Sequence, residues 1–129
     1  KKGKDLLILT CGTILGNVIN ASEKLESEYS ISSHIENLHT LNPLDPKIKS
    51  MLEDFQLVFT VEEHSVKGGL GSIISELITD NNLSTRLRKI ALPHKFLKSG
   101  TYDQLLERYS LSSEKIFNKL LVEFKNSKY

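Results

Sequence analysis

The sequence has a single cysteine, Cys11, among its 129 residues. An internal disulfide is therefore excluded, and one free thiol is typical of a protein from a reducing compartment. No apolar run approaches the roughly 20 residues that a membrane-spanning helix needs, and no signal peptide opens the chain. We therefore expect a cytoplasmic protein that does not enter a membrane.

An excess of charge of one sign is also missing. The chain has 17 Lys and Arg against 16 Asp and Glu, mixed along the sequence, for a net charge of +1. A dedicated nucleic-acid binder would be more basic and would gather that charge on one face. We expect no nucleic-acid partner.

Length and composition describe one ordinary globular domain over residues 1–129, with 39% hydrophobic and 26% charged residues. A chain of this size buries roughly two thirds of its unfolded surface, enough for a core without disulfides. The first predicted strand starts only four residues into the chain. We therefore expect a fragment or subunit of something longer.

Strand-like and helical patterns alternate along the chain. The strand-like runs are residues 5–10, 31–39, 57–61 and 86–92. Apolar side chains recur at helical spacing in residues 14–25, 48–55, 70–78, 102–109 and 116–124. Asp45 is placed to cap the second helix, Asn81 and Asn82 to end the third, and Thr101 with Gln104 to form a capping box. The alternation predicts a mostly parallel sheet with helices on both faces.

The segment EEHSVKGGLGS, residues 62–72, follows the most strand-like run. It is not a P-loop, because Lys67 precedes the glycines, and it is not a dinucleotide fingerprint, because Ile74 stands where the third glycine belongs. A hydrolase nucleophile elbow has glycines two positions before and two positions after its serine, but Ser72 has Leu70 and Ile74 there. An anion site at the following helix and a closely packed corner both remain open.

Glu62, Glu63 and His64 are expected at the carboxyl end of a central strand, where open α/β sheets bind ligands. A salt-bridged corner that fixes loops or a subunit contact is the other interpretation. Ser65 beside His64 is no evidence for a triad, and Cys11 is interpreted as a small buried residue. The four histidines have no helical i, i+4 pair and there is a single cysteine, so we predict no metal site.

Three ordered segments carry a family resemblance. Residues 61–72 (VEEHSVKGGLGS), 38–45 (LHTLNPLD) and 95–109 (KFL, SG and LLERY) resemble the C-terminal domain of transketolase-like enzymes, over nearly the whole chain. His39 and Asn42 replace an arginine and a lysine common in the family. An anion contact made there in relatives is therefore in doubt.

The resemblance implies an α/β three-layer sandwich with about five strands, mostly parallel, and one antiparallel edge strand. It implies a parent enzyme that transfers a two-carbon ketol unit between sugar phosphates, in the pentose phosphate pathway, with thiamine diphosphate and magnesium held between two other domains. The magnesium motif of those domains begins GDG, which this sequence lacks. We therefore expect that the domain alone binds neither cofactor and is inactive.

The implied role is structural. The partners would be the diphosphate-binding and pyrimidine-binding domains of the parent, in a homodimer. We interpret the carboxylates and histidine of residues 62–72 as facing outward toward a neighbouring domain or subunit. The motif and interface candidates are Glu62, Glu63, His64, Gly68, Gly69, Gly71 and Ser72.

Other parents remain possible. Related domains form the C-terminal part of deoxyxylulose-phosphate synthases and of the beta subunits of 2-oxo-acid dehydrogenase complexes. Those relatives often have glycine where His64 stands. His64 therefore favours transketolase. A free-standing, non-catalytic interaction module is the alternative from another class.

Overall fold

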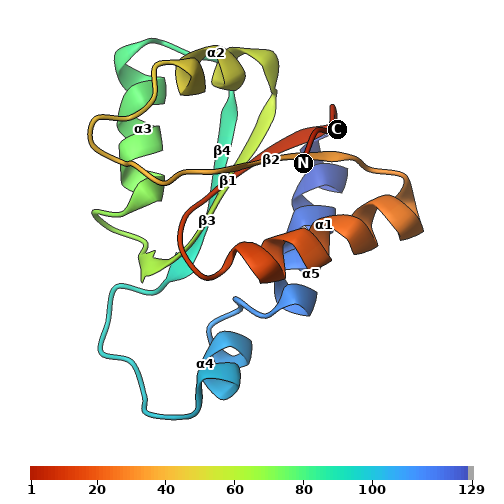
Figure 1. Ribbon diagram of the computed structural model, residues 1–129, viewed down its shortest axis with the longest axis vertical. Helices are drawn as coiled ribbons and strands as arrows, with labels where there is room; N and C mark the ends of the chain where they lie inside the picture. The colour runs from red at the N-terminus through yellow and green to blue at the C-terminus, as the bar shows by residue number, and fades with distance from the viewer. Residues whose placement is uncertain (128–129) are drawn as a thin grey trace.

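The computed structural model describes residues 1–127 (Figure 1). The elements in chain order are β1 (Leu6–Thr10), α1 (Leu15–Tyr29), β2 (Ser33–Asn37), α2 (Lys47–Asp54), β3 (Leu57–Ser65), α3 (Leu70–Asp80), β4 (Arg86–Leu92), α4 (Tyr102–Arg108) and α5 (Ser113–Ser127). Every strand and helix predicted from the pattern of apolar residues is present. The main difference is β3, which continues four residues beyond the predicted end at Val61.

The sheet has four strands in the order β2-β1-β3-β4, and all its pairings are parallel. This confirms the predicted α/β class and parallel sheet. The expected count of about five strands is corrected to four within residues 1–127. Pro93 ends β4, and the chain then passes through a loop into α4 and α5 without another strand.

The expected antiparallel edge strand is also absent from the described residues. Lys1 and Ile35 nevertheless exchange two backbone hydrogen bonds, 2.9 and 3.3 Å long. Reciprocal bonds of this kind define a hydrogen-bonded pair of antiparallel strands. The segment before β1 thus runs beside the edge of β2 and contributes antiparallel character at that pair.

Helices cover both faces of the sheet, as the alternation of elements predicted (Figure 1). Leu6 and Ile8 of β1 pack with α1 and α5 on one face, whereas Leu7 and Leu9 pack with α2 and α3 on the other. All five residues of β1 are buried. A strand buried on both faces explains why this segment is a continuous apolar run.

Two predicted helix starts are confirmed. The Asp45 carboxylate accepts a hydrogen bond from the Lys47 backbone N–H at 3.0 Å. Thr101 and Gln104 form the full capping box of α4. Helix α3 has no such local side-chain cap. The backbone N–H of Leu70, its first residue, donates instead to the carboxylate of Glu62 in β3.

Within residues 1–127, the helices are all too short or too polar to cross a membrane.

Candidate functional site

The candidate site lies at the carboxyl end of β3, where the strand passes into α3. The pairing of β3 with β4 shifts register between Val61 and Ser65. The side chains nevertheless keep alternating: Glu62 and His64 lie against Gly69 at the start of α3, whereas Glu63 reaches Thr13 and Tyr102. The neighbours Glu62 and Glu63 therefore have different surroundings.

Glu62 is buried, with only 2% of its surface exposed. Its two carboxylate oxygens accept hydrogen bonds from the backbone N–H groups of Leu70 at 2.7 Å and Gly71 at 2.8 Å. These donors belong to the first turn of α3, which has no intrahelical acceptor for them. A carboxylate there also interacts favourably with the helix dipole. The prediction that Glu62 faces outward is wrong, because its side chain caps α3 from inside.

The glycine turn is closely packed against this cap. A Cβ atom at Gly69 would lie 2.2 Å from Glu62 Oε2, and one at Gly71 would lie 2.9 Å from Thr60 Oγ1. Gly68 has a φ of +79°, a region that favours glycine, and its N–H donates to Ser72 Oγ at 2.9 Å. The N–H groups that an external anion would use therefore already hold the protein's own carboxylate.

Glu63 joins three segments of the chain. Its carboxylate accepts a hydrogen bond from Thr13 Oγ1 at 2.6 Å, in the turn after β1, and another from the hydroxyl of Tyr102 in α4. The hydrogen bond to Glu63 raises the pKa of the Tyr102 phenol above its ordinary value. Sequence patterns did not identify Thr13 or Tyr102, because both partners are distant in the chain and neither belongs to a motif.

His64 and Ser65 do not act as a pair. The Nδ1 atom of His64 lies 3.0 Å from the carbonyl oxygen of Ser65, whereas Ser65 Oγ lies 3.0 Å from Nδ1 of His94, after β4. All of these contacts are exposed to solvent. Within residues 1–127 no salt bridge involves His94, so the described part of the chain places no carboxylate there as the third member of a triad. The contact joins the loop after β4 to the end of β3.

Cys11 is half-buried near the same edge of the sheet. Burial raises the pKa of its thiol, and the negative charge of Glu62 raises it further. Reactive cysteines need a lowered pKa, because the thiolate is the nucleophile. The environment of Cys11 therefore suppresses reactivity.

The residues do not fit thiamine diphosphate or magnesium. Within residues 1–127, His, Cys, Asp and Glu side chains form no group of three that could hold a metal ion. The first N–H groups of α3, which would suit a diphosphate, bond to Glu62. His34 and His39 interact with Glu36 and Asn37 on or beside β2, away from this corner. No chemical step through these cofactors can be assigned to this chain.

Comparisons with known proteins agree on one family. The family described as "Transketolase, C-terminal domain" matches residues 1–116. A Methanocaldococcus jannaschii protein named as a transketolase C-terminal section is 37% identical over 95% of this chain, which spans 38% of that protein. The 1-deoxy-D-xylulose-5-phosphate synthase of Dictyoglomus thermophilum is 35% identical over 94% of this chain, which spans 20% of that enzyme.

A solved structure shows the same fold. It is described as "Split gene transketolase, inactive beta4 tetramer", where beta4 refers to the subunits and not to a strand. It is 28% identical, with a TM-score of 0.86 over 97% of this chain and 41% of that chain. The relatives are thus much longer than the chain described here. Together with the strand order and the residues 62–72 motif, these matches show that the chain belongs to the transketolase C-terminal domain family.

Proposed function

We propose that this chain is the structural and assembly domain of a thiamine-diphosphate enzyme that transfers a two-carbon ketol unit between sugar phosphates. The observation that carries the proposal is that the carboxylates at the carboxyl end of β3 are already bonded within the domain. Glu62 caps α3, and Glu63 holds Thr13 and Tyr102, so both carboxylates of the motif serve the fold. The catalytic groups and cofactor would then belong to other domains.

The proposed partners are the diphosphate-binding and pyrimidine-binding domains, on the same polypeptide or on another, in a dimeric enzyme. Relatives of which this chain spans only 38% and 20% support such partners. A cytoplasmic location is part of the proposal, supported by the single free cysteine.

Exposed residues of the corner would contact a neighbouring domain. His64 and Gly68 lie at the surface, and Ser72 is half-buried. We expect His64→Ala to weaken association with the cofactor-binding domains while the melting temperature of this chain stays the same. An unchanged association constant, measured by sedimentation, would remove His64 from the interface.

A second parent is favoured by a specific observation. The 35% identity to a 1-deoxy-D-xylulose-5-phosphate synthase is close to the 37% identity to the transketolase section. In that case the same domain would complete an enzyme of another pathway, and the assembly role would be unchanged.

The test is reconstitution. The chain is produced alone and together with the cofactor-binding domains from the same genome, and each preparation is assayed for ketol transfer and for formation of 1-deoxy-D-xylulose 5-phosphate. We expect neither activity nor thiamine diphosphate binding from the chain alone, and ketol transfer from the assembled enzyme. Synthase activity would select the second parent. Full activity of the cofactor-binding domains without this chain would contradict the assembly role.

A further inference from the structure

The loop between β4 and α4 extends away from the body of the molecule (Figure 1). Beside it lies an open hollow of about 600 Å³, between this loop, the end of α4 and α5. Four of the side chains that line it are cationic, and none is acidic: Lys95, Lys98, Arg108 and Lys119. We call these four residues and the hollow the basic groove. The chain as a whole has a net charge of only +1, so this is a local concentration of positive charge.

The carboxylates of Glu107, next to Arg108, and of Glu123, one helical turn from Lys119, are already engaged. Glu107 accepts a hydrogen bond from Ser112 at 2.6 Å and pairs with Lys115 at 3.4 Å. Glu123 pairs with Arg88 at 2.6 Å. Among residues 1–127, no salt bridge involves any of the four groove cations. The positive charge of the groove is therefore available to a partner.

The loop that borders the groove is fixed on both sides of an exposed aromatic residue. His94 is hydrogen-bonded to Ser65 at 3.0 Å, and the Lys98 backbone N–H donates to the Tyr109 hydroxyl at 2.8 Å. Between these two anchors, Phe96 has a relative exposure of 103%, and Leu97 is 41% exposed. An anchored loop thus presents apolar surface to solvent directly beside the cations.

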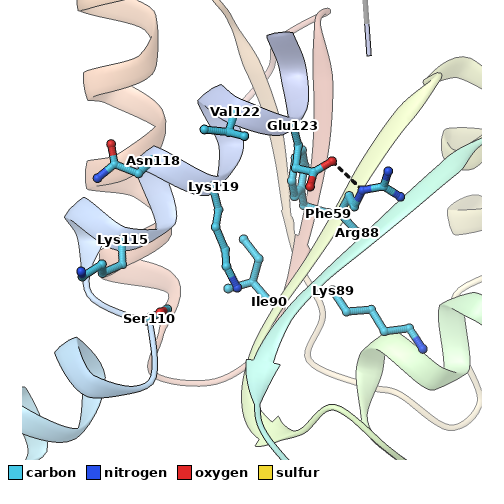
Figure 2. A pocket seen from close by; sticks show the side chains of 10 residues that line it. All are labelled: Phe59, Arg88, Lys89, Ile90, Ser110, Lys115, Asn118, Lys119, Val122 and Glu123. Carbon is cyan, nitrogen blue, oxygen red and sulfur yellow. Dashed lines mark hydrogen bonds and ion pairs between the residues drawn. The ribbon is translucent and has the colours of Figure 1, made fainter. Parts of the chain in front are cut away.

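The groove continues toward the sheet. Ser110 and Lys119 also line a second hollow of about 330 Å³ between β4 and α5. Figure 2 shows Lys119 extending from α5 toward Ile90 of β4, with the Arg88–Glu123 ion pair farther along the hollow. Ile90 and Phe59 give this part an apolar lining.

We propose that the basic groove binds an extended acidic segment of a partner polypeptide that also carries a large apolar side chain. The cations would pair with its carboxylates, and its apolar residue would cover Phe96. Exposed apolar surface bordered by charge is typical of protein interaction sites, and complementary charge favours association and fixes register. A small phosphate ester fits less well, because all four cationic side chains are exposed. The inference does not depend on the proposed function.

The probe is a fluorescein-labelled peptide of alternating Asp and Glu with a central Leu-Phe pair, and its binding to the full chain is followed by anisotropy at low ionic strength. We expect K95E/R108E to weaken binding by about tenfold or more. The matched control K2E/K49E changes net charge equally at exposed lysines elsewhere, and it should change binding by about twofold or less. Circular dichroism checks that both variants are folded.

Two further measurements, with the variant F96S and with tripolyphosphate, decide which class of ligand the groove binds. F96S, at a fully exposed position, should weaken peptide binding but leave the binding of inorganic tripolyphosphate unchanged. Equal losses in the groove and control variants would show attraction to net charge alone. If tripolyphosphate binds through the groove cations and the peptide does not bind, the groove is a small-anion site. Either result, or no peptide binding to the unmodified chain, overturns the proposal.

Discussion

Adjacent glutamates on β3 have different partners although they belong to one motif. Glu62 is buried and bonds to the start of α3, whereas Glu63 reaches Thr13 and Tyr102. A plain strand would place such neighbours on opposite faces, but only the structure shows that Glu62 is the inner one. The sequence identified both residues as important without showing which structural role each has.

Gly69 depends on its lack of a side chain more than on any ligand. A Cβ atom there would meet Glu62 Oε2 at 2.2 Å and His64 Nδ1 at 2.7 Å. We expect Gly69→Ala to lower the free energy of unfolding by about 1–3 kcal/mol, because the α3 cap would have to move. Urea denaturation measures this change.

The control for this prediction is Gly16→Ala. Gly16 lies in α1, and a Cβ atom there would have no neighbour within 4 Å. The substitution should raise stability by roughly 0.5–1 kcal/mol, as glycine to alanine does in a helix. Equal effects at Gly16 and Gly69 would contradict the steric explanation.

Cys11 reports on Glu62 through its titration. Burial is the main cause of the raised pKa of the thiol, and the charge of Glu62 is the second cause. We expect Glu62→Gln to lower the pKa of Cys11 only part of the way toward its ordinary value, because burial remains. The rate of alkylation against pH measures it cleanly, since the chain has one cysteine. Glu63→Gln is the control, and an equal fall there would exclude a specific effect of Glu62.

Among the elements, strands and helices followed from the sequence because their apolar periods are regular. The continuous run of β1 and the caps at Asp45 and Thr101 are local signals. The extension of β3 to Ser65 and its register shift are set by pairing with β4, which no local pattern encodes. The cap of α3 comes from Glu62, eight residues before Leu70, so it escaped rules that search only the adjacent residues.

Helix α4 is attached to the body partly through polar contacts. Tyr102 donates to Glu63, and Leu106 is the buried residue of the helix. We expect Tyr102→Phe to speed hydrogen exchange of the α4 amides, because one attachment is lost, with little effect on the amides of β1. Tyr29→Phe, at an exposed position of α1, is the matched control. Unchanged exchange in α4 would show that the hydrogen bond from Tyr102 to Glu63 does not hold the helix.

For the whole molecule, the segment before β1 protects one edge of the sheet. Lys1 bonds to Ile35, and Gly3 lies so close to Ser33 that a Cβ atom would be 2.3 Å from its carbonyl carbon. We expect Gly3→Ala to displace this segment and expose the edge of β2, and exposed edges promote self-association. Light scattering should show more association for Gly3→Ala than for Lys2→Ala. Equal scattering by both variants would mean that the segment does not shield the edge.

The all-parallel sheet has a consequence for the order of folding. Within residues 1–127, at least one helix lies in the chain between any two strands that pair. The backbone of β1 pairs with both β2 and β3, for example Leu7 with His34 and with Val58. Contacts this distant in sequence require closure of long loops, which slows folding. During synthesis, the centre of the sheet cannot be completed until Val61 has left the ribosome. The early product would therefore be a chain with an exposed strand in which four of the five residues, Leu6–Leu9, are apolar, the stage at which a chaperone would be most useful.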